Sequence, residues 1–313
     1  VDRPFVIHQY HGVTQYVAKQ EFVQKNAIIY NDILKNGSGY KHSKKIIKNK
    51  KMKVVGFTQL RNELEKGNLE NWFKCMLPIC DYIYIFDQNS TDGSLEYYKQ
   101  FPNVVVIASP TNRFKEELIC KIELLNKLKA EHPDTNFIMW LDGDEIIDGR
   151  LLRNNGQVFK DMCNELWTDQ YQAYLFGHKN LWRSDVHERL DDGFAGMDGN
   201  GVCKLWKFNM NLAFNNSSGL HHEQYPVNLT NKKRIDFSLI HRGFATDYQI
   251  ITKYEVYKAN GQSGWMLERL LEESTLKVQK INYEMLPSWF ELKDEVNPIE
   301  KKKIREIYNE QKH

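Results

Sequence analysis

The stretch VVGFTQLRNELEKGNLENWFKCMLPICDYIYIFD, residues 54–87, combines a strand, a helix and a second strand in close succession. VVGFTQL and YIYIFD are short apolar runs of the kind that form buried strands. Between them, apolar residues recur at the spacing of one helical face: Leu69, Trp72, Phe73 and Met76. Such a unit predicts two parallel strands joined by a crossover helix.

The alternation of strands and helices continues beyond this unit. VVVIA (104–108) and FIMWLD (137–142) read as further strands, with a helix between them over 112–128. Alternation of this kind predicts an α/β fold with a mixed, mostly parallel sheet flanked by helices. Later apolar segments, AYLFGHKNLW, KLWKF and DFSLIHRGF, predict strands of an antiparallel or mixed portion. Three helical segments are expected to close the chain: 247–259, 266–278 and 298–311.

These patterns divide the chain into three expected parts. Residues 1–50 read as an N-terminal extension ending in a glycine-containing, lysine-rich linker. Residues 51–245 form the expected main α/β domain, and residues 246–313 a C-terminal helical segment that packs on it. The chain starts at Val1, and we expect it to be part of a longer protein. Its oligomeric state is open.

Composition narrows the class of partner. The 313 residues carry a formal net charge of +2, which gives no global basic field to attract nucleic acid. No apolar run approaches the roughly 18 residues of a membrane span. Five scattered cysteines and no signal-peptide pattern predict reduced, mostly buried thiols in a cytoplasmic protein.

Three carboxylates follow the strand FIMWL at once: Asp142, Asp144 and Glu145. In an extended segment residues two apart point the same way, so Asp142 and Asp144 are expected to face one cavity. Hard oxygen donors suit Mg²⁺ or Mn²⁺, which take further ligands from phosphate. The pattern therefore predicts a metal that carries a nucleotide diphosphate at the carboxyl end of this strand.

The order of these motifs resembles the inverting family 2 glycosyltransferases of GT-A fold, which are Rossmann-like. In that family the first strand ends near an Asn-Glu pair, as at Asn62-Glu63. The second strand ends in Asp followed by Ser-Thr-Asp-Gly, as at Asp87 and residues 90–93, and the fourth ends in Asp-x-Asp. The resemblance covers residues 53–148 and implies an enzyme that uses a nucleotide-diphosphate sugar.

The second half is similar to one subgroup, the bacterial lipopolysaccharide-core glucosyltransferases. That subgroup has a Glu after its Asp-x-Asp, as with Glu145. KLWKF precedes His222-Glu223 here, and His241 precedes KYEVY, as the subgroup's pattern implies. The residue before the His-Glu pair is His221 where the subgroup usually has Val.

The resemblance implies donor-binding roles for five residues. Asp87 accepts a hydrogen bond from the donor base, and Thr58 and Glu63 line the base and ribose. Asp142 contacts the ribose or the metal, and Asp144 binds the metal, Mn²⁺ or Mg²⁺. A UDP-sugar is the expected donor.

The remaining implied roles concern the acceptor side. Glu223 is the expected general base on a glycan or other hydroxyl acceptor, and His241 is a further metal or diphosphate ligand. The glycine-rich loop from Asp191 to Gly201 is expected to close over donor and acceptor. If Glu223 is not the base, the aspartates of that loop are the next candidates.

Several of these residues have a simpler interpretation. Asp87 could only cap the turn that follows it, and His241 could be a core histidine. Glu223 could be an exposed loop carboxylate. Glu145 is expected to pair with a nearby Lys or Arg rather than with a metal.

Two other functions compete with metal-dependent, inverting sugar transfer. A nucleotidyltransferase acting on a sugar phosphate would also use an α/β sheet and a carboxylate-bound metal. It would need a basic glycine-rich loop near the first strand, where TQLRNELEKGN offers only Arg61 and Lys66. A non-catalytic carbohydrate-binding module would keep the fold without turnover, and the intact Asp142-Gly143-Asp144 argues against it.

Overall fold

The first half of the chain has the alternation that its sequence predicts. The computed structural model describes residues 52–191, 201–215 and 225–312. Its first seven elements are strands and helices in turn, and the predicted strand VVGFTQL corresponds to β1. They are β1 (Val54–Leu60), α2 (Leu69–Met76), β2 (Tyr82–Asp87), α3 (Ser94–Tyr98), β3 (Val104–Ala108), α4 (Glu117–Glu131) and β4 (Phe137–Trp140).

The second half supplies the remaining strands of the sheet and the helices near the C-terminus. Its elements are β5 (Glu145–Ile147), α5 (Gly149–Trp167), β6 (Ala173–Asn180), β7 (His187–Arg189), β8 (Val202–Lys207), β9 (Lys232–His241), α7 (Asp247–Ala259), α8 (Trp265–Glu268), β10 (Val278–Lys280), two short 3₁₀ turns (Tyr283–Met285 and Pro298–Glu300) and α9 (Ile304–Gln311).

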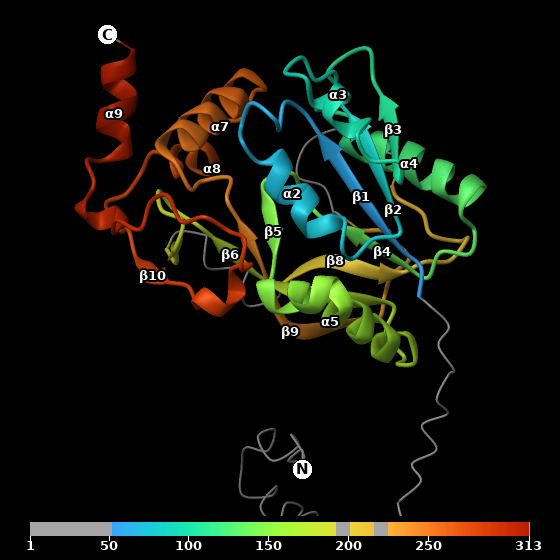
Figure 1. Ribbon diagram of the computed structural model, residues 1–313. Coiled ribbons are helices and arrows are strands. Elements are labelled where there is room, and N and C mark those ends of the chain that lie inside the picture. Colours follow the sequence, from blue (N-terminus) through green and yellow to red (C-terminus); the bar gives the residue numbers. More distant parts are fainter. Residues whose placement is uncertain (1–51, 192–200, 216–224, 313) are drawn as a thin grey trace, which may run out of the picture. The chain divides into compact units, whose positions relative to one another are not determined.

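Eight strands form one mixed sheet in the order β3-β2-β1-β4-β8-β6-β9-β5 (Figure 1). The pairs β1–β2, β2–β3, β1–β4 and β6–β9 are parallel, and β4–β8, β6–β8 and β5–β9 are antiparallel. The order 3-2-1-4 is that of a doubly wound, nucleotide-binding half. The predicted class, a mixed and mostly parallel sheet flanked by helices, is confirmed.

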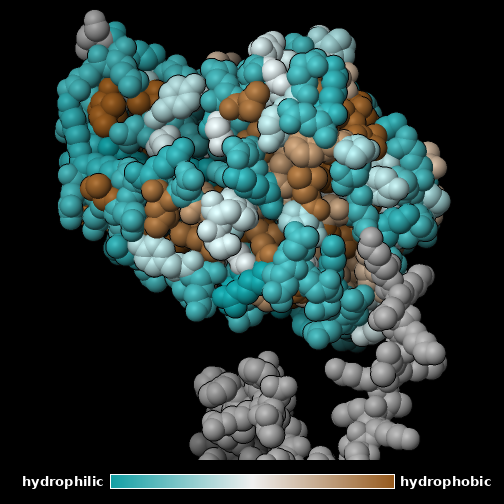
Figure 2. Space-filling model, in the orientation of Figure 1, coloured by the Kyte–Doolittle hydropathy of each residue, from teal (hydrophilic) through white to brown (hydrophobic). Residues whose placement is uncertain are grey.

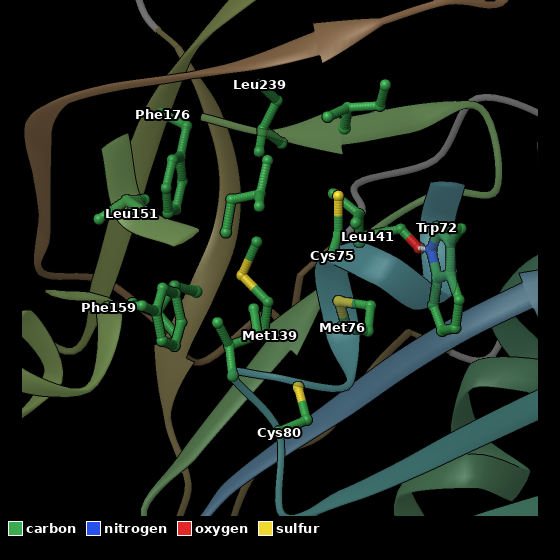
Figure 3. Packing of buried hydrophobic residues seen from close by; sticks show 14 of the residues in the cluster. Trp72, Cys75, Met76, Cys80, Met139, Leu141, Leu151, Phe159, Phe176 and Leu239 are labelled. Carbon is green, nitrogen blue, oxygen red and sulfur yellow. Dashed lines mark hydrogen bonds between the residues drawn. The ribbon is translucent and has the colours of Figure 1, made fainter. Parts of the chain in front are cut away.

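Helices cover both faces of the sheet. Leu69, Trp72 and Met76 of α2 pack with α5 residues on one face, while Leu124 and Leu128 of α4 pack on the other (Figure 1). Strand residues alternate between the two clusters because successive side chains of a strand point to opposite faces. The close-up in Figure 3 shows α2 and α5 residues meeting strand residues on the first face.

Helix α5 was not expected from the sequence. Its interior contains Asn154, Asn155 and Gly156 with positive φ angles of 52°, 54° and 76°, so two helical pieces meet at a break. A Gly156 Cβ would lie 2.6 Å from the Pro78 carbonyl oxygen, so the chain approaches too closely there for a side chain. Glycine and asparagine within a helical pattern weaken the periodic signal, which explains the omission.

The C-terminal part is less helical than predicted. Of the segment 266–278, only residues up to Glu268 belong to a helix, and Val278–Lys280 forms a strand antiparallel to β7. Helix α7 spans the predicted 247–259. Its buried Ile250 and Tyr254 pack with Trp182 and with the apolar face of α8 and α9.

All five cysteines are buried and unpaired, as the sequence predicts. The face drawn in Figure 2 is mainly hydrophilic, with apolar residues showing in several places. Within the described residues, no helix has both the length and the apolar character that a membrane crossing requires.

Candidate functional site

The turn after β4 is held from behind by helix α2. Trp72 Nε1 donates to the Leu141 carbonyl oxygen at 3.0 Å, a contact visible in Figure 3. The Glu145 N–H donates to the Asp142 carbonyl oxygen at 3.0 Å, which closes a tight turn over residues 142–145. A Cβ on Gly143 would lie 2.8 Å from the Glu63 carboxyl carbon, so glycine permits this close approach.

This turn corrects one expectation. Asp142 and Asp144 were expected to share a cavity because strand residues two apart point the same way. Strand β4 ends at Trp140, and the aspartates lie in a turn instead. Their side chains have different partners on different elements of the second half.

Asp142 and Glu145 share the buried Lys204 of β8. Lys204 Nζ lies 2.6 Å from Asp142 Oδ2 and 2.8 Å from Glu145 Oε2, and its side chain is 1% exposed. Trp140 Nε1 donates to the other Asp142 oxygen at 2.6 Å. Burial alone would raise the pKa of Glu145, but Lys204 and His178 outweigh it and lower that pKa to about 2. Glu145 therefore pairs with a lysine, in line with its expected structural role.

Asp144 faces a different set of partners. Its Oδ2 lies 3.2 Å from Nε2 of His241, at the end of β9, and 3.0 Å from Nζ of Lys253 in α7. Burial opposes ionisation here, yet Lys253 and His241 hold the pKa of Asp144 well below its usual value. The Arg242 N–H donates to the Asp144 carbonyl oxygen at 2.7 Å, which ties the turn to the end of β9.

The tautomer of His241 follows from its second partner. Nδ1 lies 2.8 Å from Asn180 Oδ1, and because that oxygen can only accept, Nδ1 carries a proton. Burial lowers the pKa of His241 although Asp144 opposes the shift, so the ring is neutral near pH 7. Nε2 is then a lone-pair donor, the form in which histidine binds metals.

Gly243 lets Lys253, Asp144 and His241 pack closely against the backbone. A Cβ built there would lie 2.2 Å from Lys253 Nζ, 2.3 Å from Asp144 Oδ2 and 2.6 Å from His241 Nε2. Any other residue would push side-chain atoms into the centre of this cluster.

The donor set fits a divalent cation only if the substrate completes it. Asp144 offers a carboxylate oxygen and His241 an imidazole nitrogen, both suited to Mn²⁺. Within the three described ranges, no group of three or more His, Cys, Asp or Glu side chains could hold a metal ion by itself. Ions that keep waters and bind phosphate oxygens fit such a two-ligand site.

The predicted base-binding residues lie along β1 and β2. Thr58 is fully buried in β1, and its Oγ1 has no hydrogen-bond partner within the described part of the protein. Glu63 follows β1 and accepts from Lys66 Nζ at 2.6 Å and Asn68 Nδ2 at 2.9 Å. Burial raises the pKa of Glu63, Lys66 opposes this shift, and the charge of Asp144 adds to it.

Asp87 ends β2 and has no exposed surface. One oxygen accepts from the Ser90 N–H at 2.8 Å and the other from the Tyr98 hydroxyl at 3.3 Å. Asp87 therefore caps its turn, the simpler of its two interpretations, and contact with a donor base stays a prediction.

The predicted acceptor residues are only partly described. Glu223, His222 and residues 192–200 of the glycine-rich loop lie outside the described residues. Asp191, an alternative base, is buried and accepts twice from Arg189, each at 3.0 Å. Its carboxylate is occupied by this pair and by the Lys277 N–H.

Four residues of the site received no role in the sequence analysis: Asn180, Lys204, Gly243 and Lys253. All four stood in segments that it quoted: Asn180 in AYLFGHKNLW, Lys204 in KLWKF, Gly243 in DFSLIHRGF and Lys253 in KYEVY. The segments were therefore noticed, but the roles of their lysines were not. Lysines are usually exposed, and no local pattern indicates which ones are buried against a carboxylate.

The solved structures that match part of this chain include a mannosyltransferase, a putative nucleotide-diphospho-sugar transferase and a glucosyl-3-phosphoglycerate synthase. The mannosyltransferase PcManGT from Pyrobaculum calidifontis, solved with GDP-Man and Mn²⁺, has a TM-score of 0.36 and 12% identity over 69% of this chain and 66% of that one. A putative nucleotide-diphospho-sugar transferase from Desulfovibrio desulfuricans G20 has a TM-score of 0.36 and 10% identity, covering 70% and 94%.

Glucosyl-3-phosphoglycerate synthase from Mycobacterium tuberculosis, solved with Mn²⁺, UDP and glucosyl-3-phosphoglycerate, has a TM-score of 0.30 and 16% identity. That match covers 41% of this chain and only 44% of the synthase. No protein-family model and no curated protein matches the chain. Similarity at these levels transfers no activity to this chain.

Proposed function

We propose that the protein is a metal-dependent glycosyltransferase of GT-A type that moves a sugar from a nucleotide-diphosphate sugar to an acceptor hydroxyl with inversion. The observation that carries the proposal is the 3.2 Å distance between Asp144 Oδ2 and His241 Nε2, which are both lone-pair donors when the ring proton is on Nδ1. The pair lies beyond the carboxyl end of β4, next to β1, where α/β sheets of this order bind nucleotides.

Asp144 and His241 would hold Mn²⁺ or Mg²⁺. Bound there, such an ion neutralises charge on a departing diphosphate. Asn180 orients His241 and keeps its proton on Nδ1, so the nitrogen nearest Asp144 is free to donate its lone pair. Gly243 lets Asp144, His241 and Lys253 come together at this point, because a Cβ there would displace all three.

We assign the donor nucleoside to the edge formed by β1 and β2. Thr58, Glu63 and Asp87 stand at that edge, and a UDP-sugar remains the expected donor. Asp142 is proposed to contact the ribose, and its side chain, at 33% exposure, is the most accessible carboxylate of the Lys204 group. The five unpaired thiols support a reducing, cytoplasmic compartment.

Glu223 is the proposed general base, which takes the proton of the acceptor hydroxyl while that oxygen attacks the anomeric carbon. Glu223→Gln keeps the shape of the side chain and removes its basicity. We expect transfer to fall about 10²–10⁴-fold while Mn²⁺ and UDP affinity stay unchanged. Glu165→Gln, an exposed position in α5, is the control. Retention of more than about a third of the rate would move the base elsewhere.

Calorimetry with UDP, GDP and dTDP, each with and without Mn²⁺, tests the proposed site directly. We expect Mn²⁺-dependent nucleotide binding in the wild type and in Asp161→Asn, an exposed carboxylate of α5. Asp144→Asn should lose it. Nucleotide binding without any effect of Mn²⁺ would contradict the metal assignment, and no nucleotide binding at all would favour a non-catalytic module.

A further inference from the structure

The Lys253 ammonium lies between the two side chains proposed to hold the metal. Its Nζ is 3.0 Å from Asp144 Oδ2 and 3.4 Å from His241 Nε2. Those two atoms are 3.2 Å apart, so ammonium, carboxylate and imidazole form a close triangle. The ammonium therefore takes the position from which a cation would contact both donors.

Helix α7 fixes Lys253 in this place. Thr246 and Gln249 form a capping box at its start, with the Gln249 N–H donating to Thr246 Oγ1 at 3.2 Å. Ile250 and Tyr254 anchor the helix in the C-terminal apolar cluster. The Lys253 side chain is 22% exposed, so it has a route to solvent that the buried Lys204 lacks.

We propose that, before metal binds, the Lys253 ammonium occupies the divalent-cation position between Asp144 and His241, so that lysine and metal exclude each other there. This inference rests on the proposed function. It adds a built-in competitor that must leave before the site can hold an ion.

The charges of the site give the competition its direction. Asp144 carries one negative charge, which Lys253 neutralises. A divalent ion beside that ammonium would be repelled at close range, where screening by water is weak. A nucleoside diphosphate brings negative charge of its own and draws the ammonium away from Asp144. Lys253 therefore couples the two ligands: UDP raises the affinity for Mn²⁺, and Mn²⁺ raises the affinity for UDP by the same factor.

Titration of free Mn²⁺ by electron paramagnetic resonance, with and without UDP, tests this coupling. The proteins are the wild type, Lys253→Met, Lys253→Gln and Lys258→Met, an exposed lysine of the same helix. Without UDP, both Lys253 variants should bind Mn²⁺ on the order of tenfold more tightly than the wild type. The enhancement by UDP should shrink in them and persist in Lys258→Met.

A gain in metal affinity cannot arise from misfolding, so a structural role for Lys253 would not produce it. Unchanged or weaker Mn²⁺ binding in both Lys253 variants, with melting temperatures near that of the wild type, would overturn the inference. Asp144→Asn is measured alongside. If Asp144→Asn binds Mn²⁺ as the wild type does, the proposed metal site fails; if it does not bind and only the Lys253 expectation fails, the proposed function stands.

Discussion

The carboxylates of the turn over residues 142–145 fall into two groups. The first half, as we call it, is Asp142 with Glu145, and the second half is Asp144; they look alike in sequence and have different partners in the folded protein. Asp142 and Glu145 are both neutralised by Lys204, whose side chain is 1% exposed. Asp144 meets a neutral histidine and Lys253, which retains 22% exposure. A buried ion pair cannot exchange its partner cheaply, whereas a partly exposed one can. Lys204 is therefore the fixed lysine of the turn, and Lys253 is the lysine that can move away from its carboxylate.

The largest expected effect separates the halves by function. Asp144→Asn should lower sugar transfer on the order of 10³-fold, because metal stabilisation of a leaving group amounts to several kcal/mol. Glu145→Gln removes a carboxylate one residue away and should change transfer by less than about tenfold in protein that is still folded. Rates with a panel of nucleotide-sugars at saturating Mn²⁺ provide the measurement. Equal losses of transfer rate in both variants would show that Asp144 and Glu145 do not differ in function.

The second-largest expected effect is on stability and concerns the pairing of Asp142 and Glu145 with Lys204. Lys204→Met leaves Asp142 and the buried Glu145 without their cation and should cost about 3–5 kcal/mol of unfolding free energy. Lys233→Met, a half-exposed lysine on β9, should cost less than about 1 kcal/mol. Urea unfolding at pH 7 compares the two. A loss below about 1 kcal/mol in Lys204→Met would mean that water reaches this pair.

A third test uses acid. The folded-state pKa of Glu145, about 2, lies below the ordinary glutamate value of 4.5, so the carboxylate stabilises the fold above pH 4.5. That contribution, on the order of 3 kcal/mol, is lost as the pH falls from 4.5 toward 2. Asp144, with its lowered pKa, adds to the same trend. Urea midpoints measured between pH 7 and pH 3 should fall less steeply in Glu145→Gln than in the wild type.

The smallest effect concerns the space beside Asp144. Gly243→Ala places a methyl group against Lys253, His241 and Asp144, and should weaken Mn²⁺-dependent UDP binding about tenfold, with a stability loss of about 1–3 kcal/mol from overpacking. At Gly261 a Cβ would meet no atom within 4 Å, but the φ of +90° strains a residue with a side chain, so Gly261→Ala should lower stability without changing Mn²⁺-dependent UDP binding. If calorimetry showed that Gly243→Ala binds UDP with Mn²⁺ as tightly as the wild type does, the close packing at Gly243 would have no role in binding.

Sequence by itself determined the first half of the fold. Strands β1 to β3 have the predicted bounds because short apolar runs and helical spacing are local properties. It also located the carboxylates, since Asp87 and the Asp142–Glu145 turn follow strands that end at one edge of a parallel sheet. Helix α5 and strand β10 were missed where asparagine, glycine and a short run blurred the pattern.

Only the tertiary structure decided which lysine neutralises each carboxylate. Lys204 lies 62 residues from Asp142 in the sequence, and Lys253 lies 109 residues from Asp144. Partners at such distances are chosen by strand order and helix docking, and no local periodicity encodes them. The sequence shows which side chains can carry a charge. Which charged side chains pair with each other depends on burial, and burial is a property of the whole packed chain.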